Sequence, residues 1–129
     1  MHIHHIPAPS NVKAPPLSFG TCVGDLLFIS GIPGFDADSA LPDSFEVQFA
    51  NVVTNFTRVL TEGGATMRDL VKVNVLLTRA ADVAIMNKLY AEAFGPPPYP
   101  ARTTCVVAAL PDPKMLIEIE IEGMAALVR

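Results

Sequence analysis

The sequence has no tryptophan, only two cysteines and few charged residues. The small numbers of cysteines and charged residues restrict the compartment and the partners that we expect. Cys22 and Cys105 lie far apart and form neither a CxxC motif nor a disulfide framework, so we expect a reducing compartment, the cytoplasm. Charged residues make up 17% of the chain, the net charge is −4, and lysine and arginine form no cluster. This charge pattern disfavours nucleic acid as a partner.

Long apolar runs are also missing. No stretch of about 18 uninterrupted apolar residues exists, and the first residues do not show the positive-then-apolar order of a secretory signal, so we expect no membrane partner. Half of the 129 residues are nevertheless hydrophobic, and the mean hydropathy of +0.39 is high for a soluble monomer. This surplus of apolar residues indicates burial between subunits. The length predicts one domain over residues 1–129, with residues 1–15 as an extended arm.

Hydrophobic spacing predicts an α+β domain. Asp43 and Glu46 resemble a capping box that begins a helix, which ends at Gly63, and a second helix is expected over 82–94. Both helices should cover one face of a four- or five-stranded sheet, in two layers. Besides a short strand in the arm, the predicted strands cover residues 25–31, 69–78, 102–109 and 116–124.

Polar residues interrupt the last two predicted strands. Alternation places Arg102 and Thr104 on one face, and it places Glu118, Glu120 and Glu122 together on one face of the final strand. If these strands pair as a hairpin, Arg102 and one glutamate lie at neighbouring positions of the sheet or meet across a subunit junction. Either arrangement gives a pocket that binds a substrate carboxylate and orients a water. The alternatives are a plain salt bridge for the Arg–Glu pair and a solvated face for Glu120 and Glu122.

Other candidate groups are weaker. His2, His4 and His5 lie at the start of the chain without a distant fourth ligand, a poor zinc pattern, so no metal is expected. Cys105 alternates away from Arg102 and is predicted to be a buried core thiol. Ser30 lacks the GxSxG context of a hydrolase, and no phosphate loop or dinucleotide fingerprint is present.

Five motifs, in order and spacing, resemble the Rid family, also called YjgF or reactive intermediate deaminases. This resemblance implies a chorismate-mutase-like fold, a homotrimer with pockets at the subunit interfaces, and no cofactor. It also implies hydrolysis of enamine and imine intermediates, such as 2-aminoacrylate, to 2-keto acids and ammonia. The motifs are GDLLFISGIP (24–33), NVVTNFTRVLTEGGATMRDLVKVNVLLT (51–78), MNKLYAEAF (86–94), YPARTTCVVAALP (99–111) and LIEIE (116–120).

The resemblance also implies roles for individual residues. Arg102 in PARTT matches the arginine that holds the substrate carboxylate. Glu118, the first glutamate of LIEIE, matches the carboxylate that positions the water. Because the turn LPDPKML is longer than usual, Glu120 is the fallback for this carboxylate.

Five further positions match residues that line the family pocket. Ser30 and Gly31 match a pocket-lining pair, Asn87 a residue near the pocket mouth, and Thr104 a position where many active members carry a substrate-contacting cysteine. From the residues alone, a surface role for Asn87 is as plausible as a pocket role. Leu17 stands where many active members have a tyrosine, and SGIPG lacks the glutamine of the common SGQ.

These two departures predict an imine deaminase with an altered substrate, since losing an aromatic wall and an amide donor changes which imine fits. Two other readings stay open. One is a non-catalytic trimer that binds a small carboxylate and regulates through it. The other is the endoribonuclease activity with which some relatives are labelled, although the acidic charge lends it no support.

Overall fold

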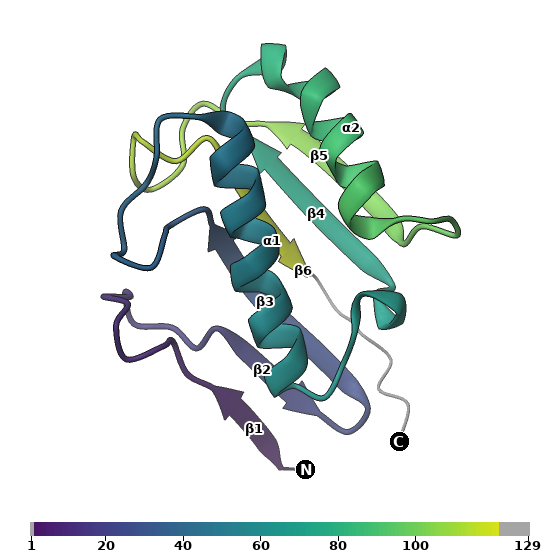
Figure 1. Cartoon of the computed structure of the whole chain (residues 1–129). Helices are drawn as coiled ribbons and strands as arrows, with labels where there is room; N and C mark the ends of the chain where they lie inside the picture. The colour runs from purple at the N-terminus through teal and green to yellow at the C-terminus, as the bar shows by residue number, and fades with distance from the viewer. Residues whose placement is uncertain (1, 122–129) are drawn as a thin grey trace.

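Six strands form one mixed sheet, and two helices cover one of its faces (Figure 1). This computed structural model describes residues 2–121, with side chains as far as Ile119. The predicted two-layer α+β fold is confirmed. The strands are β1 (Ile3–Ile6), β2 (Gly20–Val23), β3 (Leu26–Pro33), β4 (Lys72–Leu77), β5 (Ala101–Val106) and β6 (Ile117–Ile121); the helices are α1 (Phe45–Glu62) and α2 (Val83–Phe94), with short 3-10 turns η1 (Met67–Asp69) and η2 (Ala80–Asp82).

The strand order β1-β2-β3-β6-β4-β5 differs from the predicted one. β5 pairs with β4 in parallel, because α2 carries the chain back across the sheet between them. β6 lies between β3 and β4 and is antiparallel to both. The predicted hairpin of the last two strands is therefore wrong, since β4 separates β5 from β6 (Figure 1).

The expected four or five strands are also too few. β2 is a four-residue strand, GTCV, which pairs with β1 on one side and β3 on the other. Its shortness and its glycine hide any alternating pattern, so the sequence gives no strand signal there. With β2 in place, the N-terminal arm adds a sixth strand, β1, at the edge of the sheet.

The helix bounds follow local capping chemistry. Ser44, not the predicted Asp43, caps α1: its hydroxyl accepts a hydrogen bond from the Val47 backbone N–H at 3.3 Å. Gly63 ends α1 as predicted, and Gly64 follows with a φ of +80° that glycine adopts readily. Among the described residues, no helix has the length and apolarity needed to cross a membrane.

The core lies between the sheet and the helices. Alternation along β4 buries Val73, Val75 and Leu77 completely beneath the helices, and Ile117 and Ile119 of β6 are buried beside them. Burying each such side chain contributes about 1.5–3 kcal/mol relative to leaving it exposed. Residues between these positions therefore face the side of the sheet that no helix covers, and this alternation fixes where each candidate site residue lies.

Candidate active site

Arg102 lies on the helix-covered face of the edge strand β5. It is paired in register with the buried Val73 of β4, and α2 lies above this part of the sheet (Figure 1). One guanidinium nitrogen, Nη2, donates a hydrogen bond to the amide oxygen of Asn87 at 2.7 Å. The other, Nη1, lies 3.9 Å from the sulfur of Met86. Arg102 and Asn87, which were predicted separately as site residues, are thus in direct contact.

The aromatic ring of Tyr90 contacts the guanidinium of Arg102. The guanidinium carbon of Arg102 lies 4.7 Å from the centre of the Tyr90 ring, within the range of a cation–π contact. The Tyr90 ring itself stacks on Phe94, with centroids 4.1 Å apart and planes 10° from parallel. Since Phe94 is 2% exposed, the ring that carries Arg102 rests on the core.

Tyr90 stays neutral over the physiological range. Burial raises its pKa from 10.0 to about 12, although the nearby Arg102 charge acts in the opposite direction. Its hydroxyl is buried and has no hydrogen-bond partner among the described residues. Tyr90 therefore offers Arg102 an aromatic face and not a compensating negative charge.

Arg102 has no carboxylate partner within the described part of the chain. All its contacts there are neutral: an amide oxygen, a thioether and an aromatic ring. The one ion pair among these residues joins Arg79 to Asp82 at 2.7 Å, elsewhere in the structure. The plain salt bridge that the sequence left open is thus not formed by described side chains.

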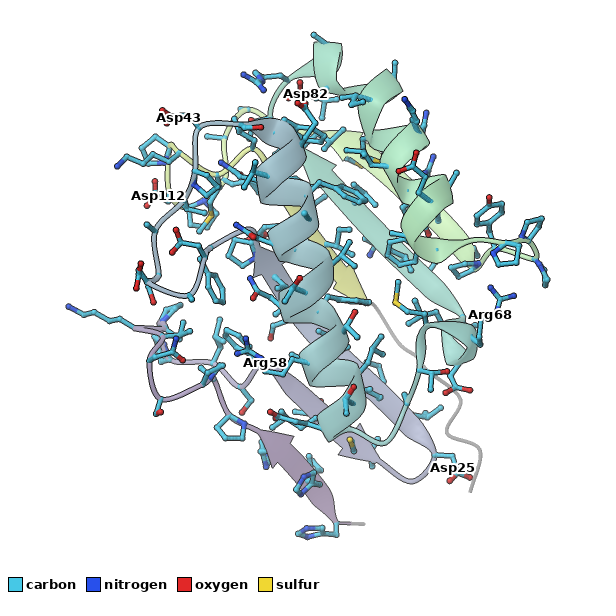
Figure 2. The ribbon with its side chains drawn as sticks, in the orientation of Figure 1. Asp25, Asp43, Arg58, Arg68, Asp82 and Asp112 are labelled. Atoms are coloured by element: carbon cyan, nitrogen blue, oxygen red, sulfur yellow. The ribbon has the colours of Figure 1, made fainter. Side chains whose placement is uncertain are left out.

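A shallow cavity of about 310 Å³ opens beside this arginine, between α2 and the loop that precedes β5. Arg102, Asn87 and Tyr90 line it together with Tyr99. Arg68 fastens that loop by donating hydrogen bonds to the carbonyl oxygens of Pro96 at 2.8 Å and Pro98 at 3.4 Å. Figure 2 shows Arg68 beside this loop, below the end of α2.

Thr104 lies two residues beyond Arg102 on the same face of β5, as alternation predicts. Its hydroxyl is buried and has no hydrogen-bond partner among the described residues. An unpaired buried hydroxyl is costly and uncommon in protein interiors. Arg102, Asn87, Tyr90, Tyr99 and Thr104 are called the arginine half-site below.

A second group of candidate residues gathers around a bulge in β3. Ile29 pairs with Ile121 and Ile32 with Ile119, so β3 uses three steps where β6 uses two. The extra residue leaves Ser30 and Gly31 together on the uncovered side of the sheet, while Ile29 and Ile32 stay buried. The sequence identified this pair but not the bulge that presents it.

Glu118 of β6 lies against this bulge. A Cβ atom added to Gly31 would come within 2.8 Å of the Glu118 Oε2 atom, so the carboxylate occupies the space that a side chain at residue 31 would fill. The Ser30 hydroxyl donates to the Ser18 carbonyl at 2.6 Å, which ties the segment that carries Leu17 to the bulge. Glu118, Gly31, Ser30 and Leu17 are called the glutamate half-site below.

A cavity of about 400 Å³ adjoins the glutamate half-site and is lined by Glu118, Gly31 and Leu17. Its far wall is the loop before β6, which Figure 2 marks by Asp112. Gln48, fully buried in α1, holds this wall: its amide nitrogen donates to the Lys114 carbonyl at 2.7 Å, and its amide oxygen accepts from the Leu116 backbone N–H at 2.9 Å.

The two half-sites lie on opposite faces of the sheet. Arg102 is in register with Val73, whereas Glu118 is in register with Leu76 on the same strand β4, and Val73 and Leu76 point to different faces. Within one chain Arg102 and Glu118 therefore do not share a pocket, which corrects the arrangement expected from a hairpin. The side chains of Glu120, the fallback carboxylate, and Glu122 lie outside the described part of the structure.

Two other expectations concern residues outside both half-sites. Cys105, predicted to be buried, is exposed in the chain, because β5 is an edge strand and Cys105 points to its uncovered face. His2, His4 and His5 are exposed near the N-terminal strand β1. No group of three His, Cys, Asp or Glu within residues 2–121 is arranged to hold a metal ion.

Sequence reasoning missed Tyr90 and Tyr99 as site residues. Tyr90 belongs to the apolar stripe of α2, so its spacing predicts a core residue, and it is indeed 4% exposed. The available signal was its position three residues after Asn87, which places both on one face of the helix. Tyr99 follows a proline-rich loop, whose path the sequence does not predict.

Comparison with known proteins supports the family resemblance that the motifs indicate. The chain matches the family model described as Endoribonuclease L-PSP over residues 8–126. It is 37% identical over 103 residues to protein mmf2, mitochondrial, of Schizosaccharomyces pombe, covering 80% of this chain and 81% of that protein. It is 36% identical over 124 residues to Reactive Intermediate Deaminase A, chloroplastic, of Arabidopsis thaliana, covering 92% of this chain and 64% of that protein.

A solved structure agrees with both. The crystal structure of RidA from the Antarctic bacterium Psychrobacter sp. matches with a TM-score of 0.81 and 34% identity, covering 94% of each chain. The chain therefore belongs to the endoribonuclease L-PSP family, which is the Rid or YjgF family that its motifs resemble.

Proposed function

We propose that this protein is a cofactor-independent deaminase that hydrolyses enamine and imine intermediates to 2-keto acids and ammonia. The observation that carries the proposal is that Arg102 has no carboxylate partner among the residues that the structure describes. A guanidinium held by an amide oxygen, a thioether and a ring keeps its planar fork for a carboxylate, which it binds through two parallel hydrogen bonds. The similarity to a Reactive Intermediate Deaminase A suggests that this carboxylate belongs to an imine or enamine substrate.

A complete site then needs two copies of the chain. In this proposal the arginine half-site of one copy meets the glutamate half-site of a second, and three such contacts close a homotrimer. The contact is supported by the exposure of Leu17 at 46% and Tyr99 at 45%, at the edges of the two half-sites. Large apolar side chains exposed at a rim are suited to burial by a partner.

The reaction then needs only positioning and proton transfer. Arg102 holds the substrate carboxylate, and Glu118 accepts a proton from a water whose oxygen bonds to the imine carbon. The π electron pair of C=N moves to nitrogen, which takes up the proton that Glu118 accepted. The hydroxyl of the resulting carbinolamine then gives its proton, through Glu118, to the nitrogen as the C–N bond breaks, so that the C=O of the keto acid forms and ammonia leaves. An enamine such as 2-aminoacrylate enters after tautomerising to its imine. One imine and one water give one 2-keto acid and one ammonia.

The proposal is tested by generating an imine beside the protein. A pyridoxal-phosphate-dependent threonine dehydratase releases 2-iminobutyrate, and 2-oxobutyrate is then followed with and without the protein. We expect faster release with the wild type, and a loss of roughly 10- to 150-fold in kcat/KM in Arg102→Ala, since a charged hydrogen bond is worth about 1.5–3 kcal/mol. Arg102→Lys keeps the charge but not the planar fork, so it should be nearly as impaired.

Arg58→Ala is the matched control, since Arg58 is an exposed arginine of α1 that lines neither cavity (Figure 2). Full activity in both Arg102 variants would contradict the proposal. Binding of 2-oxobutyrate without any acceleration would instead favour a non-catalytic carboxylate-binding trimer. Cleavage of RNA by a chain that leaves imines untouched would favour the endoribonuclease reading, which the net charge of −4 does not support.

The cellular location belongs to the same proposal. Cys22 and Cys105 are both free thiols, which suits a reducing compartment, and we propose the cytoplasm.

A further inference from the structure

The cavity beside Glu118 is larger than the smallest imino acids require. Its volume of about 400 Å³ falls in the range of sites that take drug-sized ligands, whereas 2-aminoacrylate has a skeleton of three carbons. Glu118 lies in its lining, next to Gly31. A substrate carbon attacked by a water at Glu118 would therefore have this empty volume directly beside it.

Apolar side chains from three separate segments form most of the lining. The N-terminal arm, the loop before α1 and the loop before β6 each contribute. The apolar lining residues include Ala14, Leu17, Phe19, Phe35, Leu41 and Met115. Such a surface stabilises a hydrocarbon group and penalises a polar one that finds no partner.

Besides Glu118, the charged or hydroxyl-bearing residues in the lining are Lys13, which is exposed, and Ser39 and Asp112, which are engaged within the chain. The Ser39 hydroxyl donates to the Asn11 carbonyl at 2.9 Å. The Asp112 carboxylate accepts a hydrogen bond from the Lys114 backbone N–H at 2.8 Å. These partners reduce what either group can offer to a polar substituent of a substrate.

The reacting carbon of a 2-imino acid carries three groups: the carboxylate, the imine nitrogen and the side chain. In the proposed function Arg102 of a second copy holds the carboxylate and the imine faces the water at Glu118. The side chain is the group left to enter the cavity.

We infer that the preferred substrates are 2-imino acids with a bulky apolar side chain, of the size found in leucine or phenylalanine, and not three-carbon imino acids. This inference rests on the proposed function and deepens it. It also gives the departure at Leu17 a physical meaning, because Leu17 adds a hydrocarbon wall to this cavity.

The test uses an L-amino acid oxidase to produce imino acids from leucine, asparagine and alanine, with the oxidase adjusted to give equal rates of imine formation. Formation of each 2-keto acid is measured with and without the protein. We expect kcat/KM for the leucine-derived imine to exceed that for the alanine-derived imine at least ~10-fold, because each buried methylene is worth about 10-fold or more. Asparagine matches leucine in shape but is polar, so its imine should be as poor a substrate as that of alanine.

Ala14→Phe fills the cavity from the arm. We expect the ratio of kcat/KM for the leucine-derived imine to kcat/KM for the alanine-derived imine to fall at least ~10-fold in this variant. A measurement on the wild type alone keeps the inference falsifiable if the variant fails to fold: by calorimetry, 4-methyl-2-oxopentanoate should bind at least ~10-fold more tightly than pyruvate.

The two proposals fail in different ways. Equal or faster hydrolysis of the alanine-derived imine, or equal binding of the two keto acids, would overturn the inference about the side chain and leave the deaminase proposal standing. No acceleration with any imine would overturn the deaminase proposal itself.

Discussion

The guanidinium carbon of Arg102 lies 4.7 Å from the centre of the Tyr90 ring, and Tyr90 in turn stacks on the buried Phe94, with ring centroids 4.1 Å apart. This column runs from the core to the candidate site, so it orients the guanidinium before any anion arrives. The amide oxygen of Asn87 fixes the same group from the side at 2.7 Å. Pre-orientation of this kind lowers the entropy cost of binding a carboxylate.

Two substitutions of Tyr90 distinguish the contribution of its aromatic ring from that of its hydroxyl. Tyr90→Leu removes the cation–π contact, which is worth about 0.5–2 kcal/mol, so the affinity for 2-oxobutyrate should fall roughly 2- to 30-fold. Tyr90→Phe keeps the ring and should bind almost as the wild type does. Calorimetric titration of folded protein at 25 °C compares the three. Equal affinity in Tyr90→Leu would show that the ring does not position Arg102.

The buried phenol also predicts a pH dependence of stability. Because burial raises the pKa of Tyr90 from 10.0 to about 12, the folded state favours the protonated form. The corresponding stabilisation, about 2–3 kcal/mol, is fully present below pH 10 and is lost as the pH rises from about 10 to 12. Denaturant unfolding of the wild type and Tyr90→Phe across this range should show the steeper loss in the wild type. Parallel curves for the two proteins would contradict this assignment.

Thr104 should affect stability and activity in opposite directions. Its buried hydroxyl has no partner among the described residues, so Thr104→Val should leave the free energy of unfolding unchanged or raise it by about 1 kcal/mol. If a bound substrate supplies the missing partner, kcat/KM should nevertheless fall. Thr103→Val is the control, because Thr103 faces the other way and accepts a hydrogen bond from Lys72 at 2.6 Å. A fall in stability without a change in kcat/KM would assign Thr104 to the fold alone.

Gly31→Ala should impair turnover more than folding. The new Cβ would lie 2.8 Å from the Glu118 carboxylate, the end of a side chain that can move, so the carboxylate should shift at little cost to stability. Gly64→Ala should do the reverse. Gly64 has a φ of +80°, and an alanine there should cost about 1–2 kcal/mol without changing kcat/KM. Unchanged kcat/KM in Gly31→Ala would mean that the position of the Glu118 carboxylate is not critical.

Periodicity predicted which side chains are buried but not which strands are neighbours. Val73, Val75 and Leu77 follow the expected alternation, and so do Arg102 and Thr104 on β5. The same pattern is equally consistent with a final hairpin and with β6 inserted beside β4, because a strand's period reports its face and not its partner. The misplaced hairpin brought Arg102 and Glu118 together within one chain.

Three features of the structure depend on contacts between residues far apart in the sequence. The bulge at Ser30 and Gly31 arises from the pairing of β3 with β6, 85 or more residues later in the chain. Cys105 looks like a core residue by composition, yet its exposure follows from the edge position of β5. The spacing of Tyr90 predicts a core residue, and the residue is buried. Its contact with Arg102 depends on the position of β5 beside α2, which the sequence does not predict.

The most direct test of the account is complementation between two impaired variants. Arg102→Ala and Glu118→Gln each remove one half-site, and Glu62→Gln, an exposed change in α1, controls for loss of a carboxylate. Each variant alone should keep at most about a tenth of the wild-type activity in the dehydratase assay. Co-expressed in equal amounts, they should assemble at random, and each mixed trimer then has one site of three that pairs an intact arginine half-site with an intact glutamate half-site. Averaged over all trimers, about one quarter of the sites are intact. Recovery of about that fraction of wild-type activity is predicted; mixed assemblies verified by native mass spectrometry that are no more active than the single variants would contradict a site shared between copies.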